Sequence, residues 1–248
     1  MAQVKPHTTT QYSYAQSRFK NVPELPVRAI CVAPSEGGKT TLMVSLILDI
    51  YRGCWMRFHV YSPTALLDDS WKAVDKYAKE VLKQDEPCLH DEFDDAAIHA
   101  FIRRQHRITQ MCKEQERKKL FGSLIIVDDF ADNAKVMRSS TSLAELFVRG
   151  RHAGVSTIVS IQKLRVVQPV VRVNCTAMFV FRLRSKAELD AIVEENSALY
   201  GPKITEQIIL RATSEPYSFL WLNLTAKEPT DVFWHRFEAR ILPRSARA

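Results

Sequence analysis

The sequence contains few cysteines and no pattern that would let them bind zinc. The five cysteines are an odd number, they are widely spaced, and no Cys-x-x-Cys pair occurs. This spacing predicts neither a disulfide framework nor a zinc site, and it favours a reducing, intracellular setting. The seven histidines also lack the spacing of metal ligands, so we assign no zinc to them.

Long apolar segments are missing as well. No apolar run is long enough to span a bilayer, and the first ten residues lack the apolar core of a secretory signal. We therefore expect a soluble protein with no direct insertion into a membrane. No internal repeat is visible.

The remaining composition is that of a folded domain with a basic surface. The 248 residues are 46% hydrophobic and 25% charged, enough for one α/β domain with insertions or for two small domains. We predict a flexible arm over residues 1–21, a single domain over 22–238 and a basic tail over 239–248. The net charge of +7 weakly favours a polyanionic partner such as nucleic acid.

Short apolar runs alternate with segments of helical periodicity. Strands are predicted near residues 28–32, 57–61, 123–127, 155–161, 176–183 and 218–224, and helices near 39–52, 65–83, 94–120, 142–152, 186–196 and 203–212. This alternation predicts an α/β fold with a mostly parallel central sheet and helices on both faces. Ligands of such sheets bind at the carboxyl ends of the strands.

The most informative stretch is Ala-Pro-Ser-Glu-Gly-Gly-Lys-Thr at residues 33–40, which lies between apolar runs at 29–32 and 42–48. A strand, a glycine-bearing loop and a helix in this order are typical of a P-loop, in which backbone N–H groups bind phosphates. Lys39 would add a positive charge and Thr40 a hydroxyl ligand for Mg²⁺. The predicted nucleotide-binding residues are Ser35, Glu36, Gly37, Gly38, Lys39, Thr40 and Thr41. Ala33 departs from the glycine of the pattern, and the alternative is a chance turn before a capped helix.

Two carboxylates follow the apolar strand at 123–127. Asp128 and Asp129 at this position resemble a Walker B element downstream of a P-loop. Asp128 would hold Mg²⁺ through water, and Asp129 would orient the attacking water. Glu is more usual at the second position, so Asp129 is another departure. Without the P-loop, a solvated turn would be the favoured explanation of the pair.

A third element is a helix end, a turn and a strand that ends in Gln162. Gln162 would lie beside the two carboxylates and contact the γ-phosphate or the attacking water. The alternative is that it merely ends a strand. Arg149, Arg151 and His152 in the turn could contact a phosphate, a neighbouring subunit or water.

These segments together resemble the genome-packaging ATPases of large double-stranded DNA viruses and virus-like transposons, in the FtsK/HerA superfamily of P-loop NTPases. The resemblance rests on residues 33–40, 124–130, 146–162 and 169–174 and covers roughly residues 27–223. It implies an ATP- and Mg²⁺-dependent motor that moves double-stranded DNA, without regard to sequence, into a preformed capsid. It also implies a homo-oligomeric ring, pentamer or hexamer, that acts with a capsid or portal-vertex protein in the virion or in the host cytoplasm or nucleus.

By this resemblance, an arginine from a neighbouring subunit completes the catalytic site. Arg151 is the predicted arginine, and Arg149 and Arg172 are the alternatives. The other predicted catalytic residues are Asp129 and Gln162, which matches the polar residue that senses the γ-phosphate in this family. For DNA phosphates, two basic stretches qualify, residues 103–119 and the pair Lys163 and Arg165. A solvated helix face is the favoured reading of the first stretch.

Other functions stay open. A plasmid- or conjugation-type DNA pump belongs to the same superfamily. The two departures, Ala33 and Asp129, also allow a non-catalytic switch in which ATP binding only controls assembly. A small-molecule kinase would use the same loop, but no lid is evident and the strand that ends in Gln162 argues against it.

Overall fold

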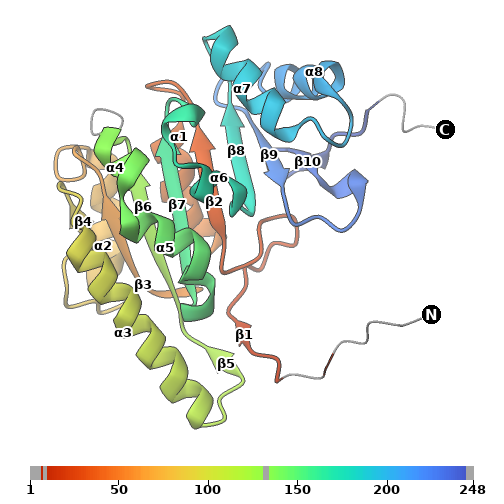
Figure 1. Ribbon diagram of the computed structural model, residues 1–248. Helices are drawn as coiled ribbons and strands as arrows, with labels where there is room; N and C mark the ends of the chain where they lie inside the picture. The colour runs from red at the N-terminus through yellow and green to blue at the C-terminus, as the bar shows by residue number, and fades with distance from the viewer. Residues whose placement is uncertain (1–6, 8–9, 131–133, 244–248) are drawn as a thin grey trace.

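The protein is built around one large sheet. The computed structural model describes residue 7, residues 10–130 and residues 134–243 (Figure 1). In these residues a nine-stranded sheet has the order β11-β10-β9-β8-β2-β7-β6-β3-β4. Its strands are β2 (Arg28–Val32), β3 (Trp55–Tyr61), β4 (Leu89–His90), β6 (Gly122–Asp128), β7 (Val155–Ile161), β8 (Ala177–Phe181), β9 (Phe219–Asn223), β10 (Phe233–His235) and β11 (Ala239–Arg240).

The strands from β8 to β4 run parallel, and β9, β10 and β11 extend the sheet in antiparallel pairs. This arrangement confirms the predicted α/β fold with a mostly parallel sheet. Strand β6 is buried along its whole length because it lies between β3 and β7 under helices on both faces. Its position explains why the sequence there is an uninterrupted apolar run.

Helices cover both faces of the sheet (Figure 1). They are α1 (Lys39–Ser45), α2 (Lys72–Glu80), α3 (Asp95–Glu114), α4 (Ala134–Ser139), α5 (Thr141–Arg149), α6 (Pro169–Val173), α7 (Lys186–Asn196) and α8 (Pro202–Ala212). On one face α1 and α2 bury Met43 and Val74. On the other, α3, α5, α7 and α8 pack a second core around Phe147. Helix α1 continues into a π-helical turn at Leu46–Ile50.

Helix α3 illustrates how local sequence sets an element. Asp94 caps its N-terminus, because its carboxylate accepts hydrogen bonds from the backbone N–H groups of Ala96 and Ala97. The buried positions recur at helical spacing and form the face that contacts the sheet; they are Ile98, Phe101, Ile102, Gln105, Thr109 and Cys112. The helix ends at Glu114, shorter than predicted, and Glu116 then takes a positive φ of 57°.

Residues near both ends of the described chain pack on the domain. Strand β1 (Ser13–Tyr14) pairs in parallel with β5 (Lys119–Leu120), a pairing that periodicity did not predict. Strand β11 adds residues of the expected tail to the sheet edge. Residues 1–6, 8–9 and 244–248 lie outside the described residues, so the division into arm, domain and tail stays a prediction.

The predicted helix over 65–83 is shorter and irregular at its start. A 3₁₀ turn over Asp69–Trp71 precedes α2. The Asp68 carboxylate accepts a hydrogen bond from the Ser70 N–H and so caps this turn, which is why the helical segment begins after residue 68. Within the described chain, no helix has both the length and the apolarity needed to cross a membrane. The five cysteines are all buried and free.

Candidate nucleotide-binding site

The loop between β2 and α1 has the shape that its sequence predicts. Ala33 directly follows β2 and continues its pairing with β7, because its N–H donates to the carbonyl of Ile161 at 3.1 Å. Gly38 has a φ of 98°, which side chains rarely adopt. A Cβ at Gly37 would come within 2.9 Å of the Pro34 carbonyl oxygen and 3.0 Å of the Ala33 Cβ. Ala33 has no positive φ, so the alanine fits the loop backbone.

Lys39 begins α1 and is only 6% exposed. Its ammonium Nζ donates to the carbonyl oxygens of Ala33 at 3.2 Å and Pro34 at 3.1 Å. These are the carbonyls of the loop itself, so the lysine lies folded over the loop. A phosphate oxygen at this position would offer Nζ a stronger, charge-assisted partner.

Asp128 is the last residue of β6 and is 3% exposed. The pKa of its carboxyl is raised to about 6: burial is the largest cause and the neighbouring Asp129 also raises the pKa, whereas Ser160 and Lys39 lower it. Ser160 lies opposite on β7, but neither its hydroxyl nor Asp128 Oδ1 has a partner of hydrogen-bond geometry among the described residues. The site thus holds a buried carboxylate oxygen that calls for a cation or a donor.

Asp129 and Gln162 contact each other across the ends of two neighbouring strands. Gln162 Nε2 donates to Asp129 Oδ1 at 3.0 Å. Asp129 has a φ of 52°, and its N–H donates to the Ser160 carbonyl at 3.3 Å. The left-handed backbone turns this carboxylate out of the strand direction. The structure therefore brings together the second carboxylate and the strand-ending glutamine, as the sequence predicted for their positions.

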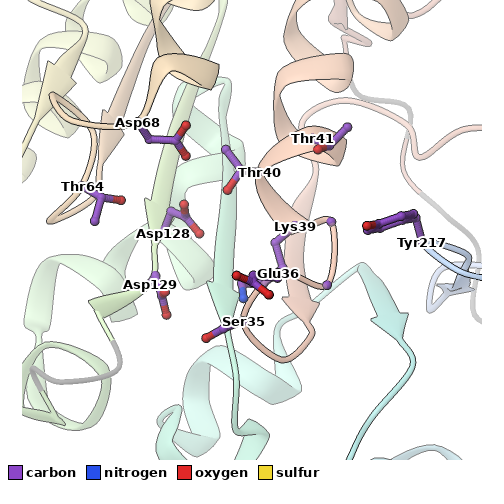
Figure 2. Close-up of a pocket in the computed structure, with 12 residues that line it drawn as sticks. Ser35, Glu36, Lys39, Thr40, Thr41, Thr64, Asp68, Asp128, Asp129 and Tyr217 are labelled. Carbon is purple, nitrogen blue, oxygen red and sulfur yellow. The ribbon is translucent and has the colours of Figure 1, made fainter.

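The loop residues and the two carboxylates line one pocket of about 300 Å³ (Figure 2). Its lining includes the whole predicted set from Ser35 to Thr41 together with Asp128 and Asp129. Lys39 and Asp128 thus share a cavity. Figure 2 shows Asp68, Asp128 and Asp129 on one side of the pocket, facing the loop.

Three lining residues were not predicted: Thr64, Asp68 and Tyr217. Thr64 and Asp68 follow the carboxyl end of β3, so the rule that ligands bind at strand ends could have found them. Tyr217 precedes β9, far away in the sequence, and no pattern around it signals a ligand. Its ring lies on the side of α1 that faces away from the carboxylates (Figure 2).

The oxygen atoms in the pocket suit Mg²⁺, which prefers carboxylate, hydroxyl and phosphate ligands. The unpartnered Oδ1 of Asp128 and the hydroxyl of Thr40, at the start of α1, are the protein's candidates. Within residues 10–130 and 134–243, no group of three or more His, Cys, Asp or Glu side chains could hold a metal alone. Phosphate oxygens of a bound nucleotide would be further ligands of the kind that Mg²⁺ prefers.

A second cavity of about 550 Å³ adjoins the first and is mainly apolar. The two share Gly38, Thr41 and Tyr217. Aromatic side chains from β8, from β9 and from the segment between β10 and β11 line the second cavity; they are Phe181, Phe219 and Phe237.

The structure places the predicted trans arginine away from this pocket. Arg151 lies in a 3₁₀ turn, Gly150–Ala153, that precedes β7, whereas the pocket lies where β2, β6 and β7 end. A seven-residue strand spans roughly 20 Å, so Arg151 cannot contact a nucleotide in its own subunit. Arg149 is exposed in the last turn of α5. Arg172 is held by an ion pair with Glu195 and a hydrogen bond to the Val167 carbonyl.

Positive charge gathers at this opposite edge of the sheet. Arg151, His152 and Arg28 line a cavity of about 530 Å³ there. Burial and then the proximity of Arg151 lower the pKa of Arg28, and Arg28 Nε is buried without a hydrogen-bond partner among the described residues. Two neighbouring guanidinium groups with an unpaired donor favour an anion at this edge.

The candidate DNA-contacting cations differ in their surroundings. Lys163 is exposed directly after Gln162, and Arg165 pairs with Glu194 at 3.0 Å. In α3, Arg104 pairs with Glu86, and Lys113 lies over the ring of Tyr12. Part of the basic stretch at 103–119 is thus already engaged by neighbouring side chains.

Comparison with known proteins gives both a family and a fold. A model of the family described as poxvirus A32 protein matches residues 15–214. "Uncharacterized protein 075L" of Invertebrate iridescent virus 6 is 26% identical over 155 residues, which are 62% of this chain and 57% of that protein. The chain spans less than two thirds of the length of the curated viral relatives that it matches.

Solved structures share the fold. The genome packaging NTPase B204 of Sulfolobus turreted icosahedral virus 2 in complex with AMP has a TM-score of 0.55 at 15% identity, over 82% of this chain and 95% of that chain. The pCW3 conjugation coupling protein TcpA has a TM-score of 0.55 at 11% identity, over 82% and 59% of the chains. The fold is that of P-loop ATPases.

Proposed function

The chain belongs to the poxvirus A32 protein family, and from this premise we propose that it is an ATP-hydrolysing motor that moves double-stranded viral DNA into a preformed capsid. One observation carries the proposal. The loop lysine Lys39, the buried Asp128 and Asp129 line one pocket, and Gln162 donates a hydrogen bond to Asp129. The likeness in fold to a genome packaging NTPase supports the same function.

The loop would bind the triphosphate of ATP. Gly37 and Gly38 let the backbone approach the phosphates closely, and Ser35 and Glu36 complete the turn. Lys39 would exchange its two carbonyl partners for phosphate oxygens. This exchange neutralises charge that phosphoryl transfer concentrates on those oxygens.

When bound, Mg²⁺ would supply positive charge that neutralises the phosphate oxygens. Thr40 and Asp128 would hold it, and Thr41 lines the same pocket. Asp128 is suited to this role because its Oδ1 is buried and unpartnered within the described chain. A nearby cation would also favour the ionised carboxylate, which burial disfavours.

Asp129 would orient the water that attacks the γ-phosphate, and Gln162 would position Asp129. The amide of Gln162 donates to one oxygen of Asp129, which fixes the carboxylate and leaves the other oxygen to accept from water. Asp is shorter than the more usual Glu. The turned-out backbone of Asp129 places the carboxylate at the pocket wall despite that shortness.

Hydrolysis would be completed by Arg151 of a neighbouring copy in a homo-oligomeric ring, pentamer or hexamer. Such an arginine contributes about 10³–10⁵ in rate. Arg151 has no carboxylate partner within the described residues, whereas the rival Arg172 is bound by Glu195. Arg149 stays a second rival, since it is equally exposed.

DNA contact would be to phosphates, because packaging must accept any sequence. Lys163 directly follows Gln162 in the sequence. A movement of Gln162 during ATP hydrolysis would therefore also move Lys163. The motor would act with a capsid or portal-vertex protein in the virion or in the host cytoplasm or nucleus. A conjugation-type DNA pump is the second candidate, and the likeness in fold to TcpA favours it.

The test is an ATPase assay with Mg²⁺, with and without double-stranded DNA, beside a measurement of particle mass. We expect hydrolysis by the natural chain, stimulation by DNA and no hydrolysis by Lys39→Ala. Lys76→Ala is the matched control, because Lys76 is exposed on α2, away from the pocket, and its ion pair is with Glu80 at 3.9 Å. Equal turnover in Lys39→Ala would refute the site. If the natural chain binds ATP but does not hydrolyse it, the non-catalytic assembly switch would be the better explanation. If it moves DNA without a capsid, the conjugation-type pump would be favoured.

A further inference from the structure

Two exposed leucines lie in the turn beside the nucleotide pocket. Leu66 and Leu67 follow β3, and they are 61% and 81% exposed. Thr64 before them and Asp68 after them both line the pocket, across from the loop (Figure 2). We call residues 64–68 the leucine turn. Its apolar side chains thus lie at the rim of the nucleotide site, where a partner that covered them would remove apolar surface from water.

The leucine turn has a fixed conformation. The backbone N–H groups of Leu67 and Asp68 both donate to the Thr64 carbonyl at 2.9 Å. Ala65 within the turn and Trp71 after it are buried, so they anchor the turn on the domain. A segment that is already ordered loses little conformational entropy when it binds a partner. The exposed leucines are therefore suited to a docking contact.

Two exposed valines lie at the opposite end of the parallel strands. Val148 is in the last turn of α5, and Val173, which is 79% exposed, is the last residue of α6. The two helices begin side by side, because Gln168 Nε2 donates to the Ser140 carbonyl at 2.8 Å. They lead into the parallel strands β7 and β8, so both end at the edge where these strands begin. We call Val148 and Val173 the valine edge.

The valine edge borders the cation-rich cavity. Phe147, next to Val148, accepts a hydrogen bond from Arg28 Nη1 at its carbonyl, at 2.9 Å. Thr176, three residues after Val173, accepts one from the Arg28 backbone N–H at its hydroxyl, also at 2.9 Å. Arg28 lines that cavity together with Arg151. Apolar side chains thus accompany the arginines at this edge, just as they accompany the carboxylates at the pocket.

The two surfaces carry opposite charge. Asp68 and Asp69 directly follow the leucines, and Arg149 and Arg151 follow Val148. Asp69 pairs with Lys72 at 2.5 Å, but both side chains are largely exposed, and such surface pairs contribute little. Opposite charges favour contact between the two different surfaces and disfavour contact between two copies of the same surface.

We propose that the leucine turn of one subunit docks against the valine edge of the next subunit and so positions that subunit's arginines at the nucleotide pocket. The inference rests on the proposed function, because it assumes that copies of this chain assemble. The occupant is a second copy, since apolar side chains and complementary charge occur together at both ends of the same strands. Such a head-to-tail contact generates a ring when the rotation between subunits closes.

The experiment measures particle mass by sedimentation in Mg²⁺ and AMPPCP. It compares the natural chain with Leu66→Ser/Leu67→Ser, with Val148→Ser/Val173→Ser and with the control Leu210→Ser, at an exposed position on α8. We expect each double variant to weaken self-association about tenfold or more and to keep its nucleotide affinity within about twofold. The control should assemble like the natural chain. All five positions are exposed, so the variants should fold.

A mixture of the two double variants tests the direction of the contact. In a head-to-tail contact the mixture keeps one intact interface, between the leucine turn of the valine variant and the valine edge of the leucine variant. We therefore expect dimers in the mixture and monomers from either variant alone. A mixture that stays monomeric would refute the contact.

Failure of the inference can be told apart from failure of the proposed function. If the leucine variant assembles like the natural chain, its leucines contact something other than a second copy, such as a capsid protein, and the inference is wrong. If the natural chain hydrolyses ATP but stays monomeric, the inference is wrong and the nucleotide site stands. If the natural chain assembles but does not bind ATP, the proposed function fails, and the variants still decide whether the contact exists.

Discussion

His59 is buried against a second histidine, and its burial should make the fold sensitive to acid. The side chain is 7% exposed on β3. Its Nδ1 lies 3.0 Å from Nε2 of His90, and its ring meets Phe101 edge-on at 5.1 Å. The perturbation that tests this is His59→Gln, which keeps a polar side chain but removes the titrating ring.

The pKa of His59 is lowered to about 4, chiefly because burial disfavours the charged ring and next because His90 lies beside it. Arg57 lowers the pKa as well, whereas Glu86 and a hydrogen bond that the ring donates to the backbone carbonyl of Pro87 raise it. In the unfolded chain the pKa returns to about 6.5. Between about pH 6.5 and pH 4 the histidine is protonated in the unfolded chain but not in the folded chain. The unfolding free energy therefore falls as the pH falls from about 6.5 to about 4. The loss amounts to roughly 2–3 kcal/mol by about pH 4.5.

Urea unfolding at several pH values between about 7.5 and 4.5 measures the effect. Other acidic groups destabilise both chains alike, so the quantity to compare is the difference between the natural chain and His59→Gln. The natural chain should lose roughly 2–3 kcal/mol more of its unfolding free energy than the variant. His7→Gln, at an exposed position, is the control and should follow the natural chain. Parallel curves for the natural chain and His59→Gln would refute the reasoning.

Two further predictions concern the motor. Arg151→Ala should lower ATP hydrolysis about 10³-fold or more and leave nucleotide affinity nearly unchanged. Mixing with Lys39→Ala subunits should restore part of the activity, because the Lys39→Ala subunit supplies Arg151 and the Arg151→Ala subunit supplies an intact nucleotide site. No recovery in mixtures shown to co-assemble would argue against an arginine in trans. Binding to double-stranded DNA should be independent of sequence and should weaken steeply with salt, and Lys163→Ala should reduce the slope of log K against log salt by about 1 in a titration by fluorescence anisotropy. Tight binding to one sequence at high salt would contradict this.

Much of the fold was predictable because buried strands and helices have recognisable patterns of apolar residues in the sequence. Strands β2 and β7 and helix α7 have the predicted bounds. The uninterrupted apolar run that became β6 is buried on both faces, and the polar residues after it lie at the pocket. The rule that ligands bind at strand ends was therefore enough to place Lys39 near Asp128.

The rest could not be read from local patterns, because it depends on contacts between distant segments. Strand β1 exists only because Lys119 and Leu120 lie beside Ser13 and Tyr14, and two-residue strands carry no periodicity. Tyr217 lines the pocket because β9 returns antiparallel beside β8, which brings the turn before it next to Gly38. Neither fact follows from the residues on either side of it.

The separation between the nucleotide pocket and the cation-rich edge limits how this protein can work. The parallel strands carry Lys39, Asp128 and Gln162 at one end and Arg28 and Arg151 at the other. Within one chain the packed sheet keeps these ends apart, so the arginines at one end cannot reach a nucleotide bound at the other end of the same chain. In a ring, the nucleotide pocket of one subunit could face the arginine-bearing end of the next subunit. The phosphates bound in the first subunit would then lie against the arginines of the second. A single chain would then bind ATP but hydrolyse it slowly, and activity should rise with protein concentration more steeply than in direct proportion.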